Sequence, residues 1–361
     1  MNVKNLYSGT MLHILHLRPK VTAALLALYF FYGASAQVLM GQAVRSQMVS
    51  LQPGWNAVYL EVDPSVADPS GFLGDLPVDI VATHIAPLQP GQFVRDPTAD
   101  LHLVYGWSVW YAPEREDAVL TTLYAIQGGR SYLMHAQTNV TFAVSGAVAS
   151  SDHKWEPNTY NFVGFPVVDP GGPTFAAFFH PSPAHRHNRI YRLVEGTWRQ
   201  VTHPANTVMR AGEAFWIYTE GRSDYRGPLE VRAASAFGVF LSGGASSEIL
   251  FRNRSAHPMT FSVEHVVDGN DDIPMAVEVP AYDEEAPGFR HVTYTFEEGG
   301  WTQPFPTLEA GQGVRLPLRL HLPAASPGRQ FSLLRVESDL GTVVYVPVTA
   351  MRDEVRTTSV P

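Results

Sequence analysis

The sequence predicts an all-β protein in which two related β-rich repeats pack together and precede a C-terminal immunoglobulin-like β-sandwich. Its composition, with 28 Pro, 29 Gly and 11% aromatic residues, favours short strands joined by turns. A pattern of strand and turn residues occurs twice in the first two thirds of the chain. The last third alternates apolar and polar residues, which is typical of strands with one buried face.

The first 36 residues have the features of a signal peptide. Three basic residues and no acidic ones precede an apolar run at 21–32. Ala34, Ser35 and Ala36 supply the small residues of a cleavage site. The apolar run is shorter than the ~20 residues that span a bilayer. We therefore expect cleavage after Ala36, no stable transmembrane segment afterwards, and a secreted, periplasmic or cell-surface location. A retained membrane anchor is the alternative, because the basic stretch is long for a signal peptide.

The charge balance excludes nucleic acid as a partner. The chain has a formal charge of −9, and loss of the three basic residues in the leader takes −9 to −12. Phosphate binding needs a Lys/Arg surface that this composition does not supply.

The chain contains no cysteine, which excludes disulfides, thiolate nucleophiles and zinc–thiolate sites. Gly311-Gln312-Gly313 lacks the third glycine of a dinucleotide loop. The sequence thus implies no cofactor. An exported chain without disulfides is typical of bacteria.

A polar leader is expected at 37–49, followed by the first repeat at 50–150. Its opening strand, 53–62, alternates aromatic and β-branched residues behind a Pro-Gly turn and ends at Asp63-Pro64. A helical turn is expected at 69–73.

The second repeat, 151–234, presents the same landmarks in the same order. Trp55-Asn56 corresponds to Tyr160-Asn161, and a short helical segment with Thr174 as its N-cap follows. The pair Glu195-Gly196 predicts a tight hairpin. The other paired landmarks are Val62-Asp63-Pro64 with Val168-Asp169-Pro170, Gly129-Arg130-Ser131 with Gly212-Glu213-Ala214, and the closing turns at Gly146 and Gly227. An internal duplication explains this order.

Residues 235–350 predict the β-sandwich, and 351–361 a flexible tail. Strands are expected at 247–253 and 259–264, joined across a polar turn. The run 314–322 alternates strictly, so one of its faces should be buried.

Pro53-Gly54-Trp55-Asn56, the Val-Asp-Pro ends and the two Gly-aromatic strands resemble uncharacterised secreted proteins of environmental bacteria. The closing run Val346-Pro347-Val348 is similar to bacterial immunoglobulin-like modules. The resemblance covers most of the mature chain. It implies an architecture and supplies no catalytic residue.

Two candidate metal sites can be read from the sequence. His180, His185 and His187 offer three imidazoles within eight residues, and an exposed loop is the alternative explanation. The run 268–272 offers oxygen ligands as a calcium loop does, but it lacks the expected glycine and the final glutamate. Turn chemistry explains that run equally well.

Aromatic residues at matching places in the two repeats form a candidate ligand-binding platform for sugar rings or a partner protein. The alternative is that they form the core between the repeats. The residues are Trp107, Trp110, Tyr111, Trp198, Trp216 and Tyr218.

The sequence therefore favours an exported, non-catalytic binding or scaffold protein of the bacterial cell surface or extracellular space. Its partner would be a polysaccharide or an envelope protein. The alternative is a carbohydrate-binding accessory or a polysaccharide-degrading enzyme. Carboxylates cluster at Glu114, Glu116 and Asp117, but nothing in the sequence places them across a cleft.

Overall fold

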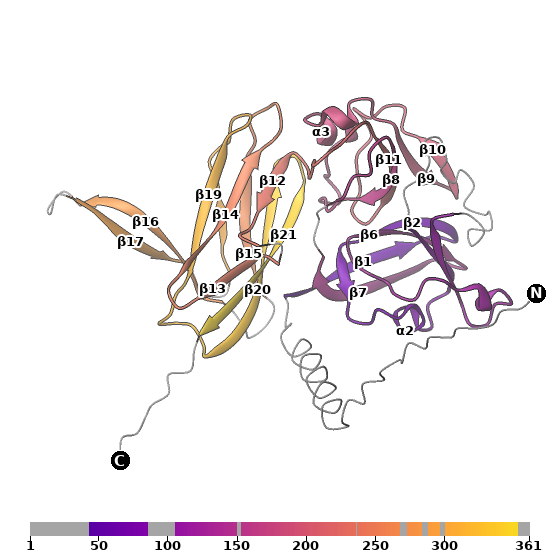
Figure 1. Cartoon of the computed structure of the whole chain (residues 1–361), viewed down its shortest axis with the longest axis horizontal. Coiled ribbons are helices and arrows are strands. Elements are labelled where there is room, and N and C mark those ends of the chain that lie inside the picture. The colour runs from indigo at the N-terminus through magenta and orange to yellow at the C-terminus, as the bar shows by residue number, and fades with distance from the viewer. Residues whose placement is uncertain are drawn as a thin grey trace, which may run out of the picture. The chain divides into compact units, whose positions relative to one another are not determined.

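The computed structural model describes residues 43–85, 105–149, 153–235, 237–267, 273–283, 288–296 and 300–352 (Figure 1). Nearly all of its regular structure is β-strand, arranged in five sheets, which confirms the all-β class. Among these residues, no helix has the length and apolar character needed to cross a membrane. The predicted signal peptide and its cleavage site lie outside the described residues.

The first four-stranded sheet belongs to the first repeat and has the order β2-β6-β4-β5. Its strands are β2 (Gly54–Leu60), β6 (Arg130–Ala136), β4 (Val78–His84) and β5 (Trp107–Tyr111). All neighbouring pairs are antiparallel. The last of these strands in the sequence, β6, lies between the first two, β2 and β4.

The second four-stranded sheet has the order β8-β11-β9-β10. Its strands are β8 (Thr159–Gly164), β11 (Ala214–Thr219), β9 (Ile190–Val194) and β10 (Thr197–Gln200). Here too the last strand in the sequence inserts between the first and the second. β9 and β10 form the predicted hairpin around Glu195-Gly196, whose φ angles of 50° and 72° suit a tight turn between twisted strands.

The cross-strand registers of the two sheets correspond. Asn56 lies opposite Met134, and Asn161 lies opposite Ile217. Each asparagine also closes the turn before its strand. The Asn56 amide exchanges hydrogen bonds with the backbone of Gln52, and the Asn161 amide does the same with Glu156. These turns satisfy backbone groups that would otherwise lack partners at the strand ends.

A three-stranded sheet, in the order β1-β7-β3, completes the first repeat. Its strands are β1 (Val44–Leu51), β7 (Val140–Val148) and β3 (Val62–Pro64). Residues 44–49, predicted to be a polar leader, instead form most of β1. The reason is visible in the alternation, because Val49 and Leu51 are buried while Met48 is exposed.

Two short helices follow the opening strands of the repeats. Both α2 (Pro69–Leu73) and α3 (Phe175–Phe179) lie where the sequence predicts a helical turn. The Thr174 hydroxyl accepts a hydrogen bond from the Ala177 N–H at 3.2 Å, which confirms the predicted N-cap. Single 3-10 turns occur at η2 (Ala118–Leu120) and η3 (Pro183–His185).

The C-terminal region is a sandwich of two five-stranded sheets around one apolar core. One sheet has the order β12-β14-β19-β16-β17, and its strands are β12 (Leu229–Arg232), β14 (Ser246–Asn253), β19 (Gly313–Leu320), β16 (Met275–Asp283) and β17 (Gly288–Thr295). The other has the order β13-β21-β20-β15-β18, and its strands are β13 (Val239–Ser242), β21 (Val343–Arg352), β20 (Gly328–Ser338), β15 (Phe261–Val266) and β18 (Thr302–Pro304).

Two details of the sandwich differ from the sequence prediction. β12 falls within the predicted second repeat but pairs with β14 of the sandwich. β14 and β15, expected to be neighbours across a turn, lie in different sheets. Periodicity identifies a strand and its buried face, but the choice of pairing partner depends on contacts distant in sequence.

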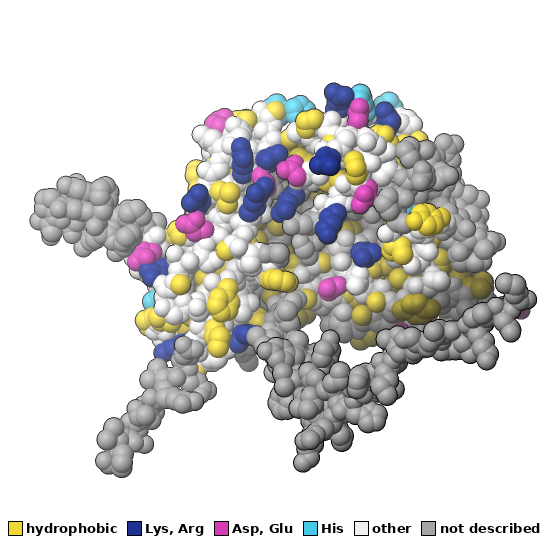
Figure 2. All heavy atoms as spheres, viewed as in Figure 1, with side chains coloured by type: hydrophobic (Ala, Val, Ile, Leu, Met, Phe, Trp, Pro, Cys, Tyr) yellow, Lys and Arg dark blue, Asp and Glu magenta, His cyan; other side chains and the backbone are white. Residues whose placement is uncertain are grey.

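The outer face of the sheet that contains β14 is rich in paired charges. Arg315 contacts Glu248 at 3.3 Å, and Arg319 contacts Glu278. Arg252 is exposed on the same face. Figure 2 shows Lys and Arg side chains gathered over β12 and β14, with acidic side chains among them. This face is therefore a mixed, solvated surface.

The two four-stranded sheets bury one cluster of side chains between them, which we call the aromatic core. Its fully packed members are Ala82, Trp107, Val109, Tyr111, Leu133, Trp198 and Trp216. The opposite face of the first sheet packs against β1 and β7, and that of the second against α3. Backbone contacts also join the sheets, since the Tyr59 N–H donates to the Gly212 carbonyl at 2.8 Å.

Candidate functional site

Five of the six aromatic residues predicted to form a ligand platform are buried. Trp107, Tyr111, Trp198 and Trp216 lie in the aromatic core, where Trp216 has no exposed surface. Trp110 points to the other side of β5, where its indole N–H donates to the Ser70 hydroxyl at 3.2 Å.

The rings of the aromatic core cover one another. The Trp216 ring stacks on Phe162 at 4.8 Å and meets Trp107 edge-on at 6.1 Å. Trp198 meets the same Phe162 ring at 5.9 Å. The faces of these rings are therefore covered by protein side chains. Tyr218, the sixth predicted residue, keeps part of its surface exposed.

Tyr218 belongs to a half-exposed group that we call the tyrosine cluster, formed by Tyr160, Tyr191, Tyr218 and Arg189. The Tyr160 ring lies 5.2 Å from Tyr218 and 5.7 Å from Tyr191, edge to face in both cases. The Arg189 guanidinium lies 4.6 Å from the centre of the Tyr218 ring. The three tyrosines come from three adjacent strands and continue the face that carries Trp216.

Local backbone geometry positions this cluster. Tyr160 and Tyr218 are directly opposite in the pairing of β8 with β11. The Tyr218 N–H donates to the Arg189 carbonyl at 3.0 Å, which holds Arg189 beside the ring. Burial, followed by the neighbouring Tyr191, raises the pKa of Tyr160, so its hydroxyl stays protonated at neutral pH. The cluster presents ring edges, hydroxyl groups and one cation.

Tyr160 and Tyr191 were not among the predicted site residues. The alternation Tyr160-x-Phe162 and Tyr191-x-Leu193 places each tyrosine on the same face as an apolar neighbour, and that signal was available in the sequence. The sequence does not show where along each strand the opposite sheet stops covering this face.

The matching position in the first sheet is occupied differently. Trp55 lies opposite His135, with ring centres 5.1 Å apart. His135 Nδ1 lies 2.6 Å from the buried carboxylate of Asp79, which also accepts a hydrogen bond from Arg115 at 2.8 Å. A charged network therefore engages this rim, whereas tyrosines are open at the other.

The three predicted metal-ligating histidines face different neighbours. His185 is buried, where Nδ1 contacts the Ser182 hydroxyl at 2.7 Å and Nε2 the Thr219 hydroxyl at 3.1 Å. Burial lowers the pKa of His185 to about 4. His187 is exposed and lies 3.3 Å from Glu220, and His180 is exposed near His257. Among the described residues, no three His, Asp or Glu side chains are placed to share one ion.

The remaining polar candidates are the predicted calcium loop and one cluster of carboxylates. The predicted calcium loop at 268–272 lies outside the described residues. Asp117 pairs with Arg115 at 2.8 Å, while Glu114 and Glu116 are exposed.

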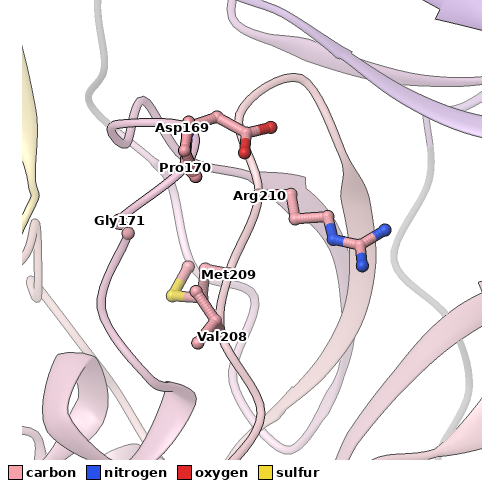
Figure 3. A pocket seen from close by; sticks show the side chains of 7 residues that line it. Asp169, Pro170, Gly171, Val208, Met209 and Arg210 are labelled. Atoms are coloured by element: carbon pink, nitrogen blue, oxygen red, sulfur yellow. The ribbon is translucent and has the colours of Figure 1, made fainter.

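An open cavity of about 550 Å³ lies between two loops of the second repeat, 169–172 and 208–210 (Figure 3). Asp169 and Arg210 supply its charged groups, and Val208 and Met209 supply apolar wall. Gly172 is required where the loops approach, because a Cβ atom there would lie 2.6 Å from the Met209 carbonyl oxygen. The volume is within the range of small-ligand sites.

No protein-family model and no curated protein matches this chain. Among solved structures, it is similar to the ASH/PapD-like domain of human CEP192, with 13% identity and a TM-score of 0.22 over 36% of this chain and 87% of that one. It is also similar to the sporulation control protein Spo0M of Bacillus subtilis, with 8% identity and a TM-score of 0.20 over 35% of this chain and 49% of that one. A third similar structure is the periplasmic chaperone SfaE, at 8% identity and a TM-score of 0.20 over 37% and 61%.

Proposed function

We propose that this chain is an exported, non-catalytic binding or scaffold protein of the bacterial cell surface or extracellular space, and that the tyrosine cluster contacts its partner. The observation that carries the proposal is the half-exposed group of three tyrosines with Arg189 beside it. Tyrosine supplies a large, rigid contact area together with a hydroxyl that can hydrogen-bond, and for this reason it is enriched at interfaces.

The edge position of the cluster supports this role. A continuous apolar face would normally be buried completely, as it is around Trp216. Here the face extends past the covered region in residues that are amphipathic rather than aliphatic. A partner that covered them would bury aromatic surface, and its own polar groups would have to pair with the tyrosine hydroxyl groups.

The test compares Tyr218→Ala and Tyr218→Phe with the unaltered chain in a glycan array and in a pull-down from bacterial envelope extract. We expect Tyr218→Ala to weaken partner binding about tenfold, because it removes the ring contact, and Tyr218→Phe to retain most of it. Tyr124→Ala is the matched control, since Tyr124 is 74% exposed and distant in sequence from the cluster. Equal binding by Tyr218→Ala and the unaltered chain would remove the cluster from the proposal.

A carbohydrate-binding accessory is the second candidate. The observation that favours it is the position of the tyrosine rings at the end of an aromatic sheet face, because sugar rings stack on such side chains. Retention on a glycan array together with no captured envelope protein would support this second candidate. The reverse result would support a protein scaffold.

Export is tested separately. The basic, acid-free leader and its Ala-Ser-Ala end support cleavage after Ala36. Expression of the full chain in a bacterial host, followed by N-terminal sequencing of the exported product, should give Gln37 as the first residue. A product that begins at Met1 and fractionates with membranes would instead indicate a retained anchor.

We also propose that the two repeats arose by duplication. The matched strand orders, the shared register at Asn56 and Asn161, and the short helix after each opening strand support this. Five sequence landmarks in the same order add to the argument.

A further inference from the structure

Three cavities share wall residues, and we call them together the arginine groove. The cavity described above, of about 550 Å³, shares Asp169 with a second of about 440 Å³. The second shares Arg45, Ser46, Arg335 and Tyr345 with a third of about 410 Å³. Because neighbouring cavities share wall residues, a chain-like ligand could contact more than one of them.

Hydrogen bonds between distant segments hold the walls of the groove. The Val168 N–H donates to the Gly341 carbonyl at 2.9 Å, and the Val343 N–H donates to the Pro166 carbonyl at 3.2 Å. These bonds fasten the loop that carries Asp169 to the start of β21, which carries Tyr345. The site is thus built from backbone that is tied down on both sides.

Arg45 is the central residue of the groove. Its Nη2 atom pairs with the buried Glu61 carboxylate, and its guanidinium lies 4.0 Å from the centre of the Tyr345 ring. Its Nε atom is buried and has no hydrogen-bond partner among the described residues. A buried donor without an acceptor is costly. Because Nε is buried, a molecule in the groove would contact the part of the Arg45 side chain that stays exposed.

Arg335 forms a row with its cross-strand neighbours. Glu264 of β15 lies opposite Arg335 of β20, which in turn lies opposite Tyr345 of β21. Arg335 contacts Glu264 at 3.1 Å and also pairs with Glu337. These side chains lie on the face of a sheet, whereas Arg45 and Ser46 come from β1, an edge strand of its three-stranded sheet.

The other end of the groove carries one acid and one base. Asp169 and Arg210 project from the two loops shown in Figure 3. In the described part of the chain, neither side chain has an ion-pair partner within 4 Å, in contrast to Arg45 and Arg335. Both are therefore available to a ligand.

The charges that line the groove balance. Its charged residues are Arg45, Arg210 and Arg335 together with Glu61, Asp169 and Glu264. A polyanion or a polycation would meet groups of its own sign along the groove. A hydroxyl group both donates and accepts, so it can bond to arginine and to carboxylate alike.

We propose that the arginine groove binds a neutral oligosaccharide segment. The proposal rests on the binding function given above, but it concerns a site whose residues are all different from those of the tyrosine cluster. Ser46 and Tyr345 add a hydroxyl and an aromatic group to the same walls, whereas the Gln47 amide already bonds to the backbone of Tyr59 and Glu61.

The experiment titrates the exported chain with cellohexaose, xylohexaose and mannohexaose by calorimetry. Hexagalacturonate, hexalysine and a neutral hexapeptide serve as competitors of other chemistry. We expect at least one neutral hexasaccharide to bind and the three competitors to bind more weakly. Arg210→Ala should weaken that binding about tenfold, by loss of a charged hydrogen-bond donor, and Val208→Trp should block the cavity.

Matched controls distinguish a change in the groove from the general effect of removing an arginine or adding a ring at the surface. Arg199→Ala removes an arginine that is exposed on the β9–β10 hairpin, and Val119→Trp adds a ring at an 85% exposed position on η2. Both controls should bind as the unaltered chain does, and so should Tyr218→Ala. All five variants change surface positions, and their melting curves are recorded to verify folding.

Three results would overturn the groove proposal. The first is absence of binding to every neutral hexasaccharide. The second is tighter binding of hexagalacturonate, hexalysine or the hexapeptide than of the neutral sugars. The third is sugar binding that survives both Arg210→Ala and Val208→Trp. If Tyr218→Ala alone removes such binding, the groove proposal fails while the proposed function of the tyrosine cluster stands.

Discussion

The two four-stranded sheets have the same strand order and corresponding registers, but the side chains on their facing surfaces differ in size. Ala57 and Leu133 of the first sheet are cross-strand partners, and the corresponding pair in the second sheet is Phe162 and Trp216. At this matched pair of positions the first sheet therefore has small side chains and the second has large rings, while Trp107 of the first sheet contacts both rings. Two identical surfaces with large rings would collide and two with small residues would leave voids, so the difference in size allows close packing.

The rims of the two sheets differ in chemistry. In the first sheet His135 pairs with Asp79 of the Asp79–Arg115 network and packs against Trp55. In the second, Tyr160 and Tyr218 remain half-exposed with Arg189. A common backbone therefore supports a structural network in one place and a candidate contact surface in the other. Substitutions at matched positions of the two sheets test these differences.

The largest effect is expected at the centre of the shared core. Trp216→Ala should lower the free energy of unfolding by about 3–5 kcal/mol, because it removes a fully buried ring from contact with Trp107 and Phe162. Leu133→Ala should cost about 2–3 kcal/mol, since it removes fewer atoms. Urea denaturation monitored by circular dichroism measures both. Equal losses at the two positions would contradict the size asymmetry.

Acid should destabilise the protein through its buried histidines. Burial lowers the pKa of His84, His153 and His185 to about 4, compared with ~6.5 in an unfolded chain. Their contribution to stability is complete above pH 6.5 and is lost as the pH falls from 6.5 toward 4, at roughly 1–3 kcal/mol for each group. Burial raises the pKa of Glu61 and Glu213, which opposes this trend, so wild type and variant are compared at each pH.

His153→Phe isolates one of these groups. The His153 ring packs 4.9 Å from Phe165 and 5.9 Å from Trp155, and phenylalanine can replace these ring contacts. Melting temperatures measured between pH 7 and pH 4.5 should fall less steeply for His153→Phe than for the unaltered chain. Parallel curves would show that this histidine does not contribute to the acid response.

The two turn asparagines provide a matched pair with a smaller effect. The Asn161 amide is buried and also donates to the Thr219 hydroxyl at 3.0 Å, whereas the Asn56 amide is partly exposed. We expect Asn161→Ala to cost about 2 kcal/mol and Asn56→Ala about 1 kcal/mol. Thermal denaturation ranks the two variants by their loss of stability. A larger loss at Asn56 would show that the turns are not equivalent in the way the hydrogen bonds suggest.

The smallest single effect is expected at the rim of the second sheet. Arg189→Ala should change stability by less than about 0.5 kcal/mol, because its guanidinium is exposed. Arg115→Ala should cost about 1–2 kcal/mol, since it leaves the buried Asp79 carboxylate with His135 alone. Chemical denaturation at two salt concentrations measures the loss of stability for each of the two variants. A significant loss for Arg189→Ala would assign the tyrosine cluster a structural role.

Local patterns in the sequence predicted many of the elements. Alternation located the opening strands, Glu195-Gly196 located a hairpin, and Thr174 located a helix N-cap. Each of these depends on neighbours within a few residues. The pairing of β12 with β14 and of β1 with β7 depends on contacts between distant segments, and the sequence pattern did not predict these pairings.

For the candidate sites too, the sequence predicted local features but not contacts between distant segments. Aromatic residues on one strand face were recognised, but whether an opposite sheet covers them depends on the packing of two sheets. The arginine groove brings together residues from 45 to 345, and no short motif connects them. Sequence periodicity therefore identified side chains capable of binding without indicating which of them remain accessible.

The aromatic core has a consequence for the order in which the chain folds. The strands of the first sheet are complete at Ala136, but the rings that cover their inner face come from β8 to β11, which end at Thr219. A chain is synthesised from its N-terminus at ~5–20 residues per second. For several seconds the first sheet must remain uncovered, so the interval before Trp216 emerges is when a nascent chain most needs protection from aggregation.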